Sequence, residues 1–356
     1  HVASSAFKKM QTQTIQSPAF NNLSKISYNE ILMNDCHSNS THSKEISFDN
    51  LFNTILELCF DLFGVRLSVD VDSFHYVYST SIIKILVKDA HFRDLGTFYF
   101  DLFDHPSKPD FSCHYTLTGR KSNSSQLSSV YLSIKIPLKY SGGKLYTSLS
   151  GASIIFHELG HCLHSMLYNG KYQNLSGTRC STDLSEIPSI LFEKFLTDPL
   201  VILKLIPNAS KNQLTELCNS QSANKYADLL KSAVDSLVDL SLNSYDKLTE
   251  LDSINIINNL FENLGFFKKG NLIIHYQYFS HFIHYPSKYY SYLWSHACAK
   301  MIWEDLFNKK AFNVDAGRAF RDNFLAKGAS CSGFELMENT LSMPVTLQAI
   351  VNSLFS

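Results

Sequence analysis

The feature that most constrains this chain is the stretch FHELGHCLHSM (156 to 166), in which two histidines stand four positions apart. The apolar residues around them recur on one stripe at helical spacing, so His157 and His161 are expected one turn apart on the same helix face. We expect that helix to end at Asn169-Gly170, a pair typical of helix C-termini. Two neutral imidazoles at this spacing can bind one Zn²⁺, and Glu158 beside them can accept a proton from a water molecule that the metal polarises.

This tripartite pattern is specific. In a chain with 14 histidines, chance predicts roughly 0.02 matches to it. The alternative is a helix whose histidines only pack in the core or face solvent. A catalytic zinc site has three protein ligands and one open position, so a third ligand in the sequence would favour the metal.

Glu186 is the candidate third ligand. It lies 25 residues after His161, at the start of a segment with helical spacing that Ser185 can cap. A loop of this length can return a second helix against the first and bring the carboxylate to the metal. Glu193 follows two turns later on the same face, where it would orient a ligating histidine. The alternative is that Glu186 is an ordinary acid at a helix N-terminus, favoured by the helix dipole.

A second group of candidate residues lies in the stretch FSHFIHYPSKYYSYLW. Tyr285, Tyr289 and Tyr292 are spaced four and three residues apart, so they can project from one helical face. His281 lies one turn earlier, if the helix extends that far past Pro286. Phenol hydroxyls can donate hydrogen bonds to the oxyanion that forms when water attacks a peptide carbonyl. The alternative is an aromatic stripe that only packs.

Composition excludes several classes of protein. With 356 residues, of which 45% are hydrophobic and 18% charged, the chain can bury a sizeable core. The formal net charge of −1 leaves no overall basic field that would hold nucleic acid. The longest apolar runs, such as residues 81 to 87, are far shorter than the roughly 20 residues that a membrane span requires. Eight scattered cysteines without a CxxC pair argue against a zinc ribbon or a disulfide scaffold and fit a reducing compartment.

The patterning along the chain predicts a polar segment followed by one domain. Residues 1 to 45 are polar and expected to be partly disordered, and residues 46 to 64 form a helix that ends at a glycine. Between about 80 and 137, the runs IIKILV, LGTFYFDLF, CHYTLTG and VYLSIKIPL predict four strands of one small sheet. From about 149 to 356 nearly everything has helical periodicity. We therefore expect residues 46 to 356 to form one α+β domain, mainly α with a small β-sheet.

These motifs resemble the thimet oligopeptidase family of zinc metallopeptidases. The resemblance rests on FHELGHCLHSML, YQNLSGTRCSTDLSEIPSIL and SHFIHYPSKYYSYL. It extends from about residue 50 to the C-terminus, which is the C-terminal half of a typical member. Within the family, GTRC, EIPSIL and YYSYL are more similar to the member that acts in mitochondria than to the cytosolic thimet type. The resemblance implies a zincin-type catalytic domain that hydrolyses short or unstructured peptides.

The resemblance also assigns roles to the candidate residues of the metal helix and the helix after it. It makes His157, His161 and Glu186 the ligands of one Zn²⁺ per chain. It makes Glu158 the general base and proton shuttle, and it places Glu193 behind the ligands.

For the substrate side, the resemblance makes Tyr292 and either Tyr285 or His281 the donors to the oxyanion, and Tyr289 a substrate-binding residue. It further implies that the strand VYLSIKIPL (130 to 138) pairs with the extended backbone of the substrate.

The chain departs from the family pattern at several positions. Glycines usually flank the first tyrosine, whereas this chain has His284 and Pro286, which stiffen the loop. Ser153 stands where an acidic residue is common, and Lys135 replaces a strand asparagine. The N-terminal half, which in the family forms the opposite wall of a deep channel, has no counterpart in this sequence.

By resemblance, the expected activity is removal of a short N-terminal peptide from imported precursors in the mitochondrial matrix. A general oligopeptidase of the cytoplasm is the alternative enzyme. A truncated, non-catalytic member that binds zinc and peptides is the alternative from another class. The expected partner is a peptide or precursor-protein substrate, with no nucleic acid and no membrane span, and the chain is expected to be a monomer.

Overall fold

The computed structural model describes residues 45–70, 82–223, 225–264, 276 and 279–355. The chain divides into two compact units, each described here by itself. The larger unit contains Ser43–Ser222 and Ser295–Ile350, and the smaller unit contains Ala223–Trp294 and Val351–Ser356. The predicted polar segment, residues 1 to 45, lies outside the described residues except for Glu45. Among the described helices, none is both long enough and apolar enough to cross a bilayer.

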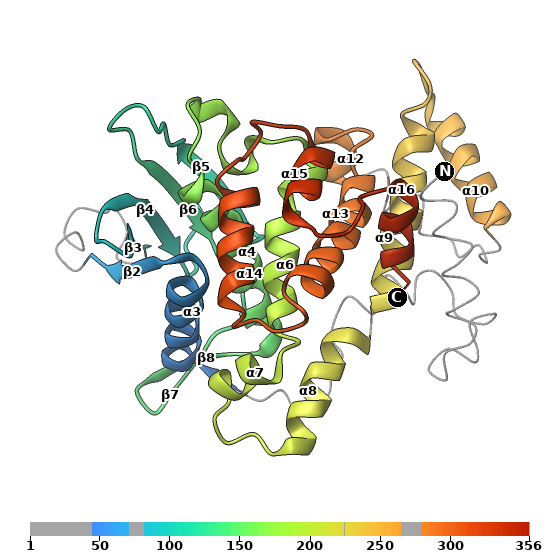
Figure 1. Cartoon of the computed structure of the whole chain (residues 1–356). Helices are drawn as coiled ribbons and strands as arrows, with labels where there is room; N and C mark the ends of the chain where they lie inside the picture. Colours follow the sequence, from blue (N-terminus) through green and yellow to red (C-terminus); the bar gives the residue numbers. More distant parts are fainter. Residues whose placement is uncertain (1–44, 71–81, 224, 265–275, 277–278, 356) are drawn as a thin grey trace. The chain divides into compact units, whose positions relative to one another are not determined.

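The larger unit is built around a five-stranded sheet (Figure 1). Its strand order is β2 (Val65–Val69), β3 (Ile82–Asp89), β4 (Asp94–Asp101), β6 (Ser128–Ser133) and β5 (Cys113–Thr118). Neighbouring strands are antiparallel except for β4 and β6, which are parallel. A second sheet has the order β1 (Ile46–Ser47), β8 (Lys144–Thr147) and β7 (Lys139–Ser141). The four predicted strands are thus confirmed, whereas the sequence did not predict β2 and the three short strands of the second sheet.

Strand β6 lies inside the sheet, which corrects one expectation. It pairs with β4 on one side and with β5 on the other over Ser128–Ser133. For this part of the predicted strand, pairing with substrate is therefore wrong, because both of its edges are occupied. For residues 134–138 it stays a prediction. Within the described part of the chain, β5 pairs with β6 alone and forms the edge of the sheet.

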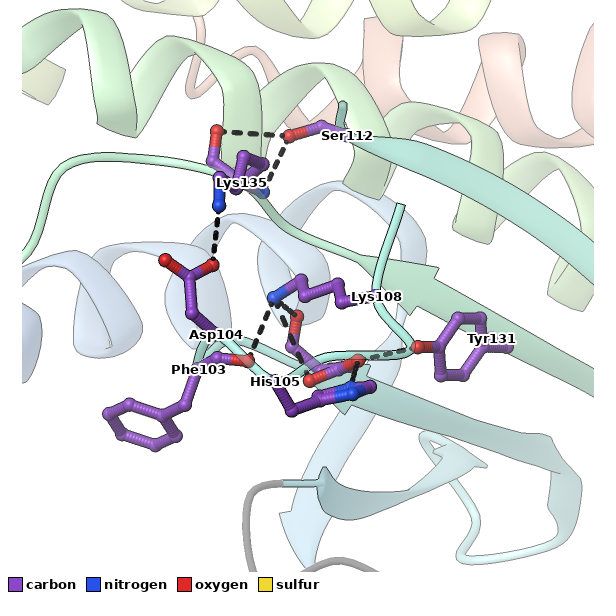
Figure 2. Close-up of polar contacts among 8 residues, drawn as sticks. Phe103, Asp104, His105, Lys108, Ser112, Tyr131 and Lys135 are labelled. Atoms are coloured by element: carbon purple, nitrogen blue, oxygen red, sulfur yellow. Dashed lines mark hydrogen bonds and ion pairs between the residues drawn. The ribbon is translucent and has the colours of Figure 1, made fainter. Parts of the chain in front are cut away.

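The connection from β4 to β5 is anchored by a buried carboxylate (Figure 2). Asp101, fully buried at the end of β4, accepts hydrogen bonds from Tyr131 Oη at 2.5 Å and His105 Nε2 at 2.8 Å. Lys108 Nζ donates to the backbone carbonyls of Asp101 and Phe103, at 2.9 and 3.2 Å. A buried carboxylate needs several such donors, since charge is costly away from water. These contacts hold the loop that leads into the edge strand.

Lys135 belongs to the same connection (Figure 2). Its Nζ lies 2.8 Å from Asp104 Oδ1, and its backbone N–H donates to Ser112 Oγ at 2.8 Å. The residue therefore joins the chain after β6 to the loop before β5.

Most of the remaining described chain is helical, as predicted. In chain order the α-helices are α3 (Phe48–Phe63), α4 (Leu149–Leu167), α5 (Thr182–Ser185), α6 (Ile187–Phe195), α7 (Pro199–Leu205), α8 (Lys211–Ala223), α9 (Lys225–Leu242), α10 (Glu250–Asn263), α12 (Ser280–His284), α13 (Tyr290–Met301), α14 (Val314–Phe320), α15 (Gly333–Thr340) and α16 (Leu347–Ser353). Short 3₁₀ turns η4 (Gln173–Leu175) and η5 (Gly177–Arg179) and π-helical turns η6 (Ile302–Leu306) and η7 (Arg321–Leu325) complete them.

The first predicted helix is confirmed as α3. The side chain of Ser47 accepts a hydrogen bond from the backbone N–H of Asn50, and Gly64 ends the helix with a φ of +64°. A left-handed residue at this position favours glycine, because glycine has no Cβ. One face of α3 is buried, and Phe63 at its end stacks on Phe192 of α6 with ring centroids 5.7 Å apart.

Candidate metal centre

The helix that carries both candidate histidine ligands is α4. It begins at a cap in which Ser148 Oγ accepts a hydrogen bond from Gly151 N. It ends at Leu167, because Tyr168 has an extended conformation with a ψ of 130°. The predicted end at Asn169-Gly170 is therefore two residues too late, and Gly170 does not adopt a left-handed conformation. A glycine is needed there for another reason, since a Cβ would lie 1.9 Å from Tyr168 Oη.

The candidate carboxylate ligand Glu186 lies at the junction of two helices. Ser185 does not cap the helix that follows, contrary to the prediction. It ends α5, and its hydroxyl donates to the backbone carbonyl of Thr182 at 3.0 Å. Glu186 itself occupies the N-cap position of α6.

Helix α6 packs directly against α4. At the crossing, a Cβ on Gly160 would lie 2.6 Å from the backbone O of Pro188 and from Cα of Ser189. Such distances are too short for a real contact, so only glycine allows this approach. The close packing of the two helices brings Glu186 to the histidines.

The structure places His157, His161 and Glu186 together. Glu186 Oε2 lies 3.3 Å from His157 Nε2 and 3.2 Å from His161 Nε2. Their potential ligand atoms all lie within 4.8 Å of one another. Among the described residues, this is the only group of three or more His, Cys, Asp and Glu side chains close enough to hold a metal ion.

The donor set and its surroundings fit zinc. His157 Nδ1 lies 2.5 Å from Glu193 Oε1, so this nitrogen donates to the carboxylate and leaves Nε2 free to act as a ligand. Ser189 Oγ donates to Glu186 Oε2 at 2.8 Å, which orients that carboxylate. Two imidazoles and a carboxylate match the ligands that catalytic zinc sites use. His157 and Glu186 each have an outer hydrogen bond, whereas His161 Nδ1 has no partner among the described residues.

The charges in this group keep its carboxylates ionised. Burial by itself would raise the pKa of Glu186, but His161 and His157 outweigh it and hold that pKa well below its usual range. Burial would likewise lower the pKa of His157, yet its hydrogen bonds to Glu186 and Glu193 raise that pKa well above the usual value. Glu186 and Glu193 are therefore ionised, and a metal ion that binds His157 must replace the proton that these carboxylates stabilise on it.

Glu158 has the environment of a proton-transfer group. It is 5% exposed, and its Oε2 has no hydrogen-bond partner among the described residues. Burial raises its pKa, and the neighbouring histidines only partly offset this effect. A buried carboxylate with a raised pKa and an oxygen without a hydrogen-bond partner is suited to accept a proton and to release it again.

Two histidines beside this group were not singled out from the sequence. The His114 ring on β5 lies 5.8 Å from that of His161, and His114 Nε2 lies 3.1 Å from Ser165 Oγ. Burial lowers the pKa of His114 to about 3 and that of His296 on α13 to about 4. Strand alternation in CHYTLT was the available signal for His114, because it places this residue on the strand face opposite Tyr115.

The four candidate substrate residues lie in the smaller unit, where the structure brings them together. The ring centroid of His281 lies 5.4 Å from that of Tyr285, 4.9 Å from that of Tyr289 and 5.6 Å from that of Tyr292. They do not share one helix, however, because α12 ends before Tyr285 and α13 begins after Tyr289. The expected continuous helical face is therefore wrong, and Pro286 lies within the break, where it cannot supply a helical N–H.

Comparisons with known proteins identify the family. A model described as peptidase family M3 matches residues 28–354. Human mitochondrial intermediate peptidase is 29% identical over 306 residues, covering 83% of this chain and 42% of the relative. The mouse protein of that name is 30% identical over 319 residues, covering 86% and 43%. The one from Schizosaccharomyces pombe is 28% identical over 344 residues, covering 86% and 44%.

The chain therefore spans less than half the length of these relatives. The match nevertheless extends through both stretches of candidate residues, and the α+β architecture agrees with the expected fold class. As the motif resemblance predicts, this chain belongs to peptidase family M3.

Proposed function

We propose that this chain is the catalytic part of a zinc endopeptidase that cuts short or unstructured peptides. The observation that carries the proposal is the convergence of His157, His161 and Glu186 within ligand distance of one another, beside the buried carboxylate of Glu158. Membership in a peptidase family supports the same reaction class.

In this mechanism each side chain of the group has a separate task. Zn²⁺ held by His157, His161 and Glu186 would act as a Lewis acid for the scissile carbonyl and for the attacking water. Glu158 accepts the proton of that water and later passes it to the leaving amine. Its raised pKa suits this double role, because the carboxyl must hold the proton between the two steps. Glu193 keeps His157 in the tautomer that presents Nε2 to the metal.

The tyrosine residues of the smaller unit are proposed to act on the substrate. Tyr292 and either Tyr285 or His281 donate hydrogen bonds to the oxyanion, and Tyr289 binds the substrate. The packing of the three tyrosine rings around His281 supports treating them as one functional group. Truncating one oxyanion donor typically lowers the rate about 10²- to 10³-fold.

The names of the relatives suggest a processing role. All three relatives compared above are named mitochondrial intermediate peptidase. We propose that this chain removes a short N-terminal peptide from imported precursors in the mitochondrial matrix. A peptide library tests this role, since a processing enzyme should favour cuts at a fixed short distance from the N-terminus. Cuts without such a preference would instead favour a general oligopeptidase.

The proposed chemistry is tested by the substitution Glu158→Gln. Zinc content is measured by elemental analysis, and cleavage is measured on a quenched fluorescent peptide with and without a chelator. Glu338→Gln is the matched control, because Glu338 is exposed on α15. We expect one zinc per chain in all three proteins, and chelator-sensitive cleavage in the parent and the control only.

Two results would contradict the proposal. A parent chain that binds no zinc would overturn the metal assignment. A Glu158→Gln variant that cleaves as fast as the parent would overturn the assignment of Glu158 as the base.

A further inference from the structure

The smaller unit contains a buried carboxylate, that of Asp239, which accepts hydrogen bonds from two backbone N–H groups and one side-chain amide. Asp239 on α9 is fully buried. Its Oδ1 accepts hydrogen bonds from the backbone N–H of Ser287 and from Asn243 Nδ2, both at 2.9 Å. Its Oδ2 accepts one from the backbone N–H of Tyr289, also at 2.9 Å. A carboxylate that is buried away from solvent is stable only when hydrogen-bond donors surround it. Hydrogen bonds to an ionised acceptor are also stronger than those between neutral groups.

Two of these donors belong to the segment that joins α12 to α13, residues 285–289, which we call the tyrosine loop. Asp239 accepts a hydrogen bond from the loop backbone at Ser287 and another at Tyr289, two residues further on. The loop also contains a backbone hydrogen bond from Lys288 N to Tyr285 O at 3.2 Å. The carboxylate therefore determines the path of the backbone between two candidate substrate residues.

The conformation that Asp239 holds is not one the loop would favour by itself. Ser287 has a φ of +59°, in the left-handed region that non-glycine residues rarely adopt. Pro286 before it has a ring that restricts φ, so this part of the loop has little freedom to relax. A strained residue of this kind persists only where surrounding contacts over-determine it, and the two bonds to Asp239 supply such contacts.

The side chains at the two ends of the loop pack on His281. The ring centroid of Tyr285 lies 5.4 Å from that of His281, and the centroid of Tyr289 lies 4.9 Å from it. Tyr289 also contacts Tyr292, with centroids 5.1 Å apart. A shift of the loop backbone would therefore move the rings of Tyr285 and Tyr289 relative to His281 and Tyr292.

We propose that Asp239 is a positioning residue of the active site, whose carboxylate holds the tyrosine loop so that Tyr285 and Tyr289 stay around His281. This inference rests on the proposed function, because it needs the tyrosines to act on substrate. Asp239 itself touches no substrate and acts only through the loop backbone.

The test is the substitution Asp239→Asn, which keeps the side-chain size but replaces one acceptor oxygen by an NH₂ group. Asp198 provides a matched control, since it is a buried carboxylate that also accepts from two backbone N–H groups, those of Leu200 and Ala311. Asp198→Asn removes the same charge and the same kind of bond in the larger unit. Any general loss of stability should therefore be similar in the two variants.

Three measurements are made on the zinc-loaded parent and on both variants: kcat and KM for a quenched fluorescent peptide, zinc content, and hydrogen exchange of the loop amides. For Asp239→Asn we expect kcat to fall about 10- to 100-fold, because a misplacement of about 1 Å costs this much in rate. Zinc content should stay at one per chain, and the amides of Ser287 and Tyr289 should exchange faster. Asp198→Asn should change neither kcat nor the exchange of these two amides.

The outcomes separate this inference from the proposed function. If the parent cleaves the peptide and Asp239→Asn keeps kcat within twofold of it, the positioning role is wrong while the proposed function stands. If both variants lose kcat equally, the effect is one of stability, and the positioning role is again overturned. A zinc-loaded parent that cleaves no peptide would overturn the proposed function and the positioning role together, whatever the exchange rates.

Discussion

Replacing Glu193 by glutamine should weaken zinc binding without removing a ligand. Glu193 Oε1 lies 2.5 Å from His157 Nδ1, so the carboxylate fixes the tautomer that leaves Nε2 directed at Glu186. Glutamine keeps the size and one accepting oxygen, but it removes the negative charge that makes His157 a better donor. Loss of such an outer carboxylate typically lowers metal affinity about 10- to 100-fold, which is about 1.4 to 2.7 kcal/mol.

The zinc affinity of the parent, of Glu193→Gln and of the exposed control Glu338→Gln is measured by competition with a chelator of known affinity at fixed pH. We expect the control to have the zinc affinity of the parent and Glu193→Gln to bind zinc about 10- to 100-fold more weakly. A Glu193→Gln affinity within twofold of the parent value would refute the reasoning, because His157 would then not depend on its hydrogen bond to Glu193.

Two further predictions concern α4. Gly160→Ala should destabilise the larger unit by about 1 to 3 kcal/mol and weaken zinc binding, because the added Cβ would lie 2.6 Å from Pro188 O; an unchanged urea midpoint and zinc affinity would contradict this. Burial lowers the pKa of His164 to about 3, so below pH 6.5 the unfolded chain takes up a proton that the folded chain does not, and stability is lost as the pH falls towards 3. The contribution of His164 to this loss should be about 2 kcal/mol between pH 7 and pH 5. The total loss, measured by urea unfolding at both pH values, should therefore be smaller by about this amount in His164→Leu, while the buried His114 and His296 keep their own contributions; an equal total loss in parent and variant would show that His164 is not a source.

The local spacing of residues already determined half of the metal centre. His157 and His161 converge because residues four apart in any α-helix lie on one face, whatever the rest of the chain does. The same holds for the capped helix α3, which Ser47 and Gly64 delimit, and for the strands, which alternation and composition predict.

What spacing could not determine was which elements lie beside one another. Alternation marks β5 and β6 equally as strands, and only the pairing of β6 on both sides shows that β5 is the edge. Glu186 reaches the histidines because Gly160 admits α6 against α4, which is a contact between segments far apart in the chain.

The tyrosines show that local spacing can also predict a structure that the chain does not form. Their spacing predicted one helical face, but the helix breaks at the tyrosine loop, and the rings meet through packing on His281 and through the bonds of Asp239 to the loop backbone. Helical and strand periods follow from backbone geometry within a few residues, so the sequence alone determined them. The convergence of distant side chains depends on which surfaces are buried together and on how buried charges find donors, so only the tertiary structure decided it.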